Sequence, residues 1–257
     1  MEAMLFAAGL GTRLKPLTNT MPKALVPVGG QPLLKLTLEK LHMAGAERVI
    51  VNVHHFSQQV IDYLSSHHFD CLVEVSDETE QLLDTGGGLK RASVLFKSEN
   101  PILIHNVDIL SNADLCTFYN KNINNEVTLL VSNRRSSRYL LFNEQMEMVG
   151  WTNVNTGEVK SPYSDLDLNH CRKLAFSGIH LFSPALFPCF KAFPDKFSIT
   201  DFYISICDKV KIKGYVQDDL QLLDVGKLDT IAKAEEFLQN TENRFEGGPR
   251  PCISLEG

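Results

Sequence analysis

The sequence predicts a doubly wound, Rossmann-like α/β fold with a mostly parallel sheet and a smaller second half. Short apolar strands alternate with amphipathic helical segments through the first half, which is typical of a parallel sheet covered by helices. The chain has 257 residues, which suits one large α/β domain or two small ones. Ligands of such sheets bind beyond the carboxyl ends of the strands, so we expect the functional site there.

The elements of the first half follow from hydrophobic period and turn residues. Residues 32–44 carry leucines close to a 3.6-residue period and predict a helix that ends near Gly45. The other expected helices cover 57–66, 88–96 and 114–122, and the expected strands cover 4–8, 48–53, 71–75, 101–107 and 127–131.

The second half is less regular, and its elements are shorter. It is expected to contain a hairpin at 140–142 and 148–151, a loop at 162–172, strands at 174–182, 211–216 and 220–225, and helices at 184–190, 200–209 and 230–240. Residues after about 240 lack periodicity. We therefore expect one functional domain over 1–240 and a mobile tail over 241–257.

Composition excludes several classes of protein. A net charge of −6 argues against a nucleic-acid partner. No apolar run is long enough to span a bilayer, and the N-terminus does not resemble a signal peptide, so we expect a cytoplasmic protein without a membrane partner. The six cysteines form no Cys-x-x-Cys pair, which argues against a zinc site or a redox dithiol. Anionic substrates would have to be held by local cations.

The most informative segment is the glycine loop after the first strand. Gly9 and Gly11 allow a tight turn and a close approach of the backbone to a ligand. Four successive amides could point into one anion-binding concavity, those of Leu10, Gly11, Thr12 and Arg13. Arg13 and Lys23 add two positive charges, and the pattern indicates a polyphosphate site. The run lacks the Gly-Lys-Ser/Thr ending of a P-loop and the third glycine of a dinucleotide fingerprint.

The whole run of residues 7–33 resembles the signature of the sugar-1-phosphate nucleotidylyltransferases. The matching motifs are Gly9-Leu10-Gly11-Thr12-Arg13, Pro16-Leu17-Thr18, Pro22-Lys23-Ala24-Leu25, Pro27-Val28 and Pro32-Leu33. The resemblance extends over about residues 3–238. It implies a Rossmann-like nucleotidyltransferase fold and a reaction in which an NTP and a sugar 1-phosphate give an NDP-sugar and pyrophosphate.

Two aspartates follow apolar strands, Asp108 in Asn106-Val107-Asp108 and Asp224 in Asp224-Val225-Gly226. Each could hold a hard cation such as Mg²⁺, or could cap a turn. The resemblance implies that Asp108 and Asp224 share the catalytic Mg²⁺, although the chain has Val107 where the family usually has glycine. It also places Asn106 on the sugar side of the site.

The segment Asp84-Thr85-Gly86-Gly87-Gly88 offers bare backbone at the start of a helix. The resemblance implies that it lines the nucleobase, with Thr85 and Gly86 as the candidates for base contacts. The carboxylate before Thr85 is most similar to uridylyltransferases of the N-acetylmuramate-1-phosphate type. Guanylyltransferase relatives more often have glycine there, so the segment favours uridine.

The strand around Gly178 resembles the sugar-side strand of the family, where glycine backbone contacts the sugar. The Glu-Lys pair that often binds the sugar phosphate is missing from this sequence. The candidate substitutes are Lys160, Arg172, Lys173 and Arg138, and the sequence does not choose among them.

The resemblance assigns Arg13 to the departing phosphates and Lys23 to the α-phosphate or the incoming phosphate. We expect UTP with an N-acetylated amino-sugar 1-phosphate, in a monomer or small homo-oligomer. The alternatives are a guanylyltransferase for mannose or heptose 1-phosphate, a phosphocholine cytidylyltransferase, and a regulatory subunit that binds NDP-sugar without turnover.

Overall fold

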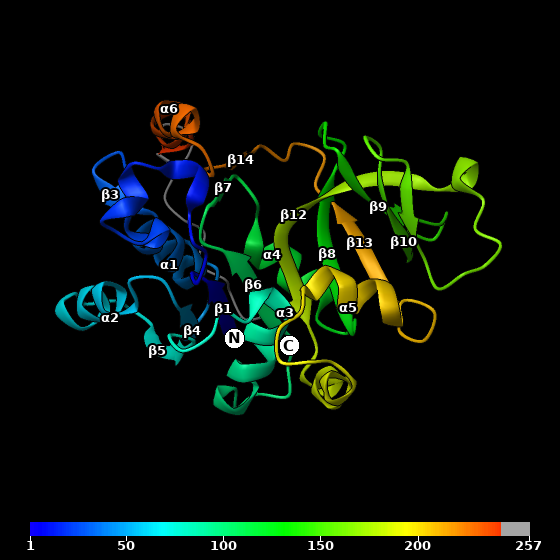
Figure 1. The fold of residues 1–257 in the computed structure, drawn as a ribbon, viewed down its shortest axis with the longest axis horizontal. Helices are drawn as coiled ribbons and strands as arrows, with labels where there is room; N and C mark the ends of the chain where they lie inside the picture. Colours follow the sequence, from blue (N-terminus) through cyan, green and yellow to red (C-terminus); the bar gives the residue numbers. More distant parts are fainter. Residues whose placement is uncertain (243–257) are drawn as a thin grey trace, which may run out of the picture.

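The computed structural model describes residues 1–242 as a ten-stranded mixed sheet with helices on both faces and two small two-stranded sheets (Figure 1). The large sheet contains β1 Glu2–Phe6, β4 Arg48–Val53, β5 Leu72–Asp77, β6 Ile102–Asn106, β8 Val127–Ser132, β9 Arg138–Phe142, β10 Met148–Asn153, β11 Glu158–Lys160, β12 Arg172–Phe182 and β13 Ile212–Val216. The small sheets pair β2 Pro27–Val28 with β3 Gln31–Pro32 and β7 Ile109–Ser111 with β14 Leu222–Asp224.

The helices of the described residues largely match the expected ranges. They are α1 Leu33–Met43, α2 Ser57–Ser66, α3 Asp84–Ala92, α4 Leu115–Asn122, α5 Ile199–Ile206 and α6 Ile231–Glu242. Short 3₁₀ segments are η1 Thr12–Leu14, η2 Leu17–Asn19, η3 Lys23–Leu25, η4 Ser93–Leu95, η5 Leu168–His170, η6 Pro184–Ala192 and η7 Leu228–Thr230. The expected tail over 241–257 lies outside the described residues from 243 onward.

The sheet is parallel in the first half and turns antiparallel at β12. β1 lies between β4 and β6, and β4 continues to β5, with all three pairings parallel. β12 then pairs antiparallel with β6, β8 and β9, and β10 continues from β9 to β11. Figure 1 shows the parallel strands on the left and the hairpin strands β9 and β10 on the right. The expected doubly wound fold with a smaller second half is therefore confirmed.

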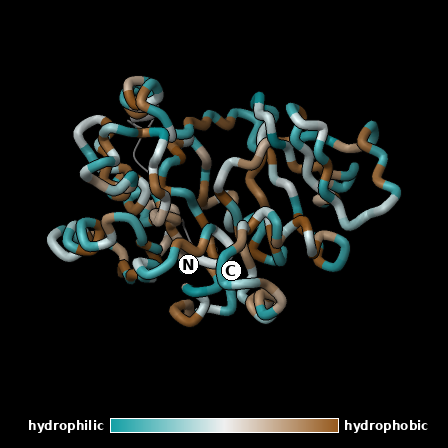
Figure 2. Tube along the Cα trace, in the orientation of Figure 1, coloured by the Kyte–Doolittle hydropathy of each residue, from teal (hydrophilic) through white to brown (hydrophobic). Residues whose placement is uncertain are grey.

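The sheet separates two hydrophobic cores because successive side chains of a strand point to opposite faces. In β1, Ala3 and Leu5 belong to one core, whereas Met4 and Phe6 belong to the other. α1, α2, α4 and α6 pack against the first core, and α3, α5 and η6 against the second. Brown, apolar stretches follow the central strands in Figure 2.

Three differences from the expected elements matter for the site. The helix expected over 88–96 begins at Asp84, so the three glycines lie inside α3. The expected loop 162–172 contains the short turn η5, and the edge strand β11 was not expected. β7 was also missed, because three residues are too few for a period to show.

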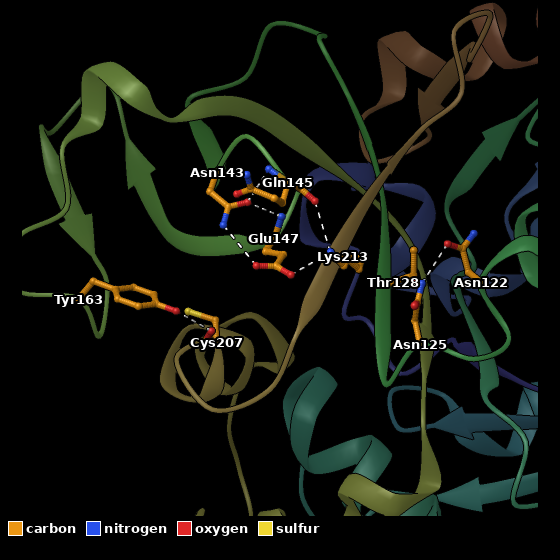
Figure 3. Close-up of polar contacts among 9 residues, drawn as sticks. All are labelled: Asn122, Asn125, Thr128, Asn143, Gln145, Glu147, Tyr163, Cys207 and Lys213. Atoms are coloured by element: carbon orange, nitrogen blue, oxygen red, sulfur yellow. Dashed lines mark hydrogen bonds and ion pairs between the residues drawn. The ribbon is translucent and has the colours of Figure 1, made fainter.

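Polar contacts hold the second half together (Figure 3). Lys213 of β13 forms an ion pair with Glu147 at 2.9 Å, and Asn143 donates to the other oxygen of the same carboxylate at 3.3 Å. The hydroxyl of Tyr163 donates to the carbonyl of Cys207 at 3.1 Å. These contacts join the β9–β10 hairpin and the following loop to the chain after α5. Across residues 1–242, no helix has both the length and the apolar character needed to cross a bilayer.

Candidate active site

The glycine loop leaves β1 at the carboxyl edge of the parallel strands and folds into three short 3₁₀ turns. Gly11 has a φ of +63°, and a Cβ at this position would lie 2.8 Å from Cγ2 of Thr18 and 3.0 Å from Cβ of Lys23. The Thr18 hydroxyl donates to the Gly11 carbonyl at 2.8 Å. Glycine is therefore required by both backbone conformation and space. No long helix follows the loop, because Pro16 and Pro22 disfavour helical backbone in the residues before them.

Lys23 lies at the start of η3 and is largely buried. Its ammonium group forms an ion pair with Oδ2 of Asp108, and the two side chains are only 11% and 17% exposed. Asp108 lies two residues after the end of β6, so the pair joins the glycine-loop region to the neighbouring parallel strand. Loss of either charge would leave the other one buried and uncompensated, which is costly.

The β7–β14 ladder brings Asp224 beside Asp108. Asp224 pairs with Ile109 in this antiparallel ladder, and the Val225 amide donates to the Asp108 carbonyl at 2.8 Å. The two aspartates, distant in sequence, are thereby fixed on adjacent backbone positions. Neither local period nor composition could place them together.

Arg13 reaches the carboxylate of Asp224 from the glycine loop. One of its terminal nitrogens lies 4.0 Å from Oδ2 of Asp224. A Cβ on Gly226 would lie 2.6 Å from Nη2 of Arg13 and 2.6 Å from Oδ1 of Asp224. Gly226 therefore leaves the space in which the guanidinium and the carboxylate meet. Both side chains are about half exposed, so this ion pair alone contributes little to stability.

The electrostatics of the aspartate pair favour a bound cation. Burial and the nearby charge of Asp108 raise the pKa of Asp224, while Lys23, Arg13 and Arg134 act to lower it. Within residues 1–242, no group of three or more His, Cys, Asp or Glu side chains is arranged to hold a metal ion. Mg²⁺ commonly takes one or two protein carboxylates and completes its shell with water and phosphate oxygens. The Asp108–Asp224 pair fits that ion.

A cavity of about 490 Å³ lies between the glycine loop, the end of β6 and the start of α3. Most of the predicted site residues line it, namely Leu10, Gly11, Thr12, Arg13, Lys23, Thr85, Asn106 and Asp108. It is also lined by residues that the sequence did not single out, namely Phe6, Asn52, Glu78, Leu82 and Lys196. The predicted Gly86, Gly178 and Asp224 do not belong to the lining.

The glycines of α3 serve close packing. The amide of Gly86 donates to the carbonyl of Phe197 at 2.9 Å, and a Cβ on Gly86 would lie 2.3 Å from the Phe197 ring. A Cβ on Gly87 would lie 2.0 Å from the carbonyl oxygen of Asp195. The structure thus places Gly86 against the segment before α5, whereas Thr85 remains at the cavity wall.

A buried amide–carboxyl pair supports the floor of the cavity. Asn52 accepts from the Ala7 amide at 2.8 Å and donates to Glu78 at 2.7 Å. Glu78 is 1% exposed, also accepts from the Leu83 amide at 3.3 Å, and has its pKa raised by burial. Asn52 thus links the first residue after β1 to the segment leading into α3. A polar residue inside the apolar strand 48–53 was the available signal, and the sequence reasoning missed it.

Gly178 meets Asn106 beside the aspartates. Gly178 has a φ of +77°, and a Cβ there would lie 2.7 Å from Nδ2 of Asn106. The residue sits where the register between β12 and β8 shifts, which marks a bulge between Phe176 and His180. The bulge presents main chain towards Asn106 at the end of β6. The two residues predicted for the sugar side are therefore brought together.

A family model described as "Nucleotidyl transferase" matches residues 2–148, which hold the glycine loop, Lys23 and Asp108. The chain belongs to this nucleotidyl transferase family. The expected recognition of the family is thereby confirmed, and the match covers more than half of the chain.

Two curated relatives of this nucleotidyl transferase differ in coverage. This chain is 45% identical over 109 residues to an N-acetylmuramate alpha-1-phosphate uridylyltransferase of Caulobacter vibrioides. That alignment covers 41% of this chain and 45% of the relative. The chain is 25% identical over 241 residues to a D-glycero-alpha-D-manno-heptose 1-phosphate guanylyltransferase of Aneurinibacillus thermoaerophilus, covering 93% of this chain and 99% of the relative. The first alignment thus spans less than half of the uridylyltransferase.

The fold of this nucleotidyl transferase is also similar to that of solved structures. HddC from Yersinia pseudotuberculosis, complexed with GMP-PN, superposes with a TM-score of 0.73 at 20% identity, covering 92% of this chain and 99% of HddC. At this identity the likeness shows the fold alone.

The four candidate sugar-phosphate cations of this nucleotidyl transferase lie in the second half. Lys160 contacts Asp201 at 3.4 Å and lies 5.3 Å from the centre of the Trp151 ring, and Arg172 donates to the sulfur of Met146 at 3.2 Å. Both are engaged along the β9–β11 part of the sheet. Lys173 and Arg138 are exposed on β12 and β9.

Proposed function

We propose that this chain is a nucleotidylyltransferase that joins an NTP to a sugar 1-phosphate and releases pyrophosphate. One observation carries the proposal: the glycine loop, Arg13, Lys23 and Asp108 line a single cavity, and the β7–β14 ladder fixes Asp224 beside Asp108. A polyphosphate held by the loop would lie with its phosphates beside these carboxylates. That arrangement suits phosphoryl chemistry, in which positioning and charge neutralisation are the main requirements.

The roles of the two cations follow from their positions. Arg13 is exposed in the glycine loop, where its guanidinium would bind the β- and γ-phosphates as pyrophosphate leaves. Lys23 is largely buried and fixed, and would neutralise the α-phosphate as the acceptor oxygen attacks in line. The attacking phosphate oxygen is already anionic, so no protein group has to remove a proton from it.

Asp108 and Asp224 would hold Mg²⁺, which would neutralise phosphate charge and orient the nucleotide. Lys23 pairs with one oxygen of Asp108. Nucleotide binding would therefore exchange this partner for the phosphates.

For the base and the sugar, we propose UTP and an N-acetylated amino-sugar 1-phosphate such as N-acetylmuramate 1-phosphate. The support is the 45% identity to the Caulobacter vibrioides uridylyltransferase across the nucleotide half, together with the carboxylate of Asp84 before Thr85. A guanylyltransferase for a heptose 1-phosphate is the second candidate, since the alignment with the Aneurinibacillus thermoaerophilus relative covers nearly the whole chain.

A pyrophosphate-release assay with four NTPs and several sugar 1-phosphates tests the proposal. We expect Mg²⁺-dependent release, with kcat/KM highest for UTP and an N-acetylated amino-sugar 1-phosphate. A site built on hydrogen bonds to the base edge can reject a mismatched base by orders of magnitude. A preference for GTP would assign the protein to the mannose or heptose branch. Absence of release with every pair would contradict the reaction itself and favour a binding subunit.

A further inference from the structure

We propose that Arg134 binds the phosphate of the sugar 1-phosphate, at a subsite formed with the β12 bulge that carries Gly178. The inference rests on the proposed function and names the residue that would replace the missing Glu-Lys pair. Arg134 was not among the four candidates from the sequence.

The position of Arg134 is set by a main-chain contact. Arg134 follows β8, and its Nη2 donates to the carbonyl of Phe176 at 2.9 Å. Phe176 opens the bulge that carries Gly178. Gly178 in turn lies against Asn106 and Ile109, which flank Asp108 in sequence. The guanidinium is therefore anchored at the bulge that leads to the aspartate pair.

The contact of Arg134 places its guanidinium at the bulge that carries Gly178. Gly178 lies against Asn106, which lines the cavity. Arg13 belongs to the glycine loop that would hold the leaving pyrophosphate, whereas Arg134 comes from the chain beyond β8. An in-line displacement requires the acceptor and the leaving group on opposite sides of the α-phosphorus. Arg134 contacts the bulge that carries Gly178, and the resemblance assigns this glycine to the sugar side, so we assign Arg134 to the acceptor.

The side chain is free to take a ligand of this kind. Arg134 is exposed, and a guanidinium has five N–H donors in a planar fork, of which the Phe176 carbonyl accepts one. The remaining fork matches two oxygens of a phosphate.

Arg138 is the strongest rival cation. In the antiparallel pairing of β9 with β12, Leu174 lies opposite Leu140. If this register continued, Arg138 would lie opposite Phe176. Arg138 is exposed as well. In contrast to Arg134, which donates to the Phe176 carbonyl, no described contact joins the guanidinium of Arg138 to the bulge.

Steady-state kinetics with the NTP and sugar 1-phosphate that the wild type uses best test the assignment. The variants are Arg134→Ala, Arg134→Gln, which keeps a donor for the Phe176 carbonyl without the charge, and Arg134→Lys, which keeps the charge. Arg135→Ala is the matched control at an exposed neighbour, and Arg138→Ala tests the rival.

We expect Arg134→Ala and Arg134→Gln to raise the KM for the sugar 1-phosphate roughly tenfold or more, as loss of a charge-assisted contact does. The KM for the NTP should change less than twofold, Arg134→Lys should recover part of the loss, and Arg135→Ala should resemble the wild type.

An unchanged KM for the sugar 1-phosphate in both neutral variants would overturn the assignment, as would equal increases in both KM values. The same increase in Arg138→Ala alone would transfer the role to Arg138. A wild type that turns over no pair would overturn the proposed function, and the Arg134 assignment with it. If the wild type turns over normally and Arg134→Ala has an unchanged KM for the sugar 1-phosphate, only the Arg134 assignment is overturned.

Discussion

Asp108 is largely shielded from water. It forms an ion pair with Lys23, and its negative charge raises the pKa of the neighbouring Asp224. Replacing it with asparagine keeps the shape and removes the charge. We expect Asp108→Asn to lose on the order of a hundredfold or more in turnover, because a charge-stabilising group in a preorganised site is worth about that much. Pyrophosphate release at saturating Mg²⁺ measures the effect.

Asp165→Asn, in an exposed loop, is the matched control for this substitution and should keep full activity. The circular dichroism spectrum of Asp108→Asn should match that of the wild type. Near wild-type turnover of Asp108→Asn would show that Asp108 is not part of the active site.

Lys23 offers a second test at the level of one side chain. Its side chain is 11% exposed, and its Cβ packs closely against Gly11. We expect Lys23→Arg to slow turnover severely even though the charge is kept, because a broad planar fork does not replace a compact ammonium in a closed space. Lys15→Arg, in the exposed part of the same loop, should be nearly neutral. Normal turnover of Lys23→Arg would mean that Lys23 acts only through long-range charge.

Buried histidines should make the fold sensitive to acid. Burial lowers the pKa of His180 to about 3, with a smaller effect from His105, and both ring nitrogens of His180 have no hydrogen-bond partner among the described residues. The unfolded chain takes up a proton below its pKa of about 6.5, while the folded chain resists until about pH 3. Stability is therefore lost as the pH falls from about 6.5 towards 3, by about 2 kcal/mol at pH 5 for this one residue.

Thermal unfolding between pH 7 and pH 5 measures this effect. The Tm of His180→Leu should fall less over that range than the Tm of the wild type. His68→Leu, at an exposed histidine, should leave the pH dependence unchanged. Equal pH slopes for His180→Leu and the wild type would contradict the assignment.

Among the elements, the start of α3 both packs against the segment before α5 and forms part of the cavity wall. Its glycines let the helix approach the segment before α5, and the carbonyl of Asp195 would lie 2.0 Å from a Cβ on Gly87. Backbone cannot move aside as a flexible side chain can. We expect Gly87→Ala to lower the free energy of unfolding by roughly 2 kcal/mol or more, as overpacking of a core does.

Gly9→Ala is the control for the Gly87 substitution, because nothing lies within 4 Å of a Cβ on Gly9. It should leave stability nearly unchanged. Urea unfolding of both variants measures the difference, and equal midpoints would show that α3 can shift without cost.

On the scale of the whole molecule, the proposed ligand should stabilise the fold. A ligand that binds only the folded state adds about 2.7 kcal/mol at a hundred times its Kd. We expect UTP with Mg²⁺ to raise the Tm clearly, and UTP with EDTA to raise it less, because Asp108 and Asp224 would then bring two negative charges to the phosphates without a metal. In Asp108→Asn, the difference between Mg²⁺ and EDTA should shrink. Equal Tm values with Mg²⁺ and EDTA in the wild type would argue against a metal at this pair.

The sequence by itself determined the α/β class, and it predicted a ligand site at the end of the first strand, with the glycine loop and Arg13. Strand alternation, glycine conformation and proline positions are properties of short stretches of chain, so a pattern can express them. The resemblance of residues 7–33 added the family, which the match over residues 2–148 bears out.

Only the tertiary structure decided which distant groups share the site. The three-residue strands β7 and β14 carry no readable period, yet their ladder fixes Asp224 beside Asp108. Asn52 meets Glu78 because β4 and β5 lie side by side, and Arg134 reaches Phe176 because β12 bulges next to β8. Gly86 looked like open backbone for a base but is covered by Phe197. Contacts of this kind depend on strand register and on which strands, distant in sequence, lie side by side. Both are set by the packing of the whole molecule and not by any local stretch of residues.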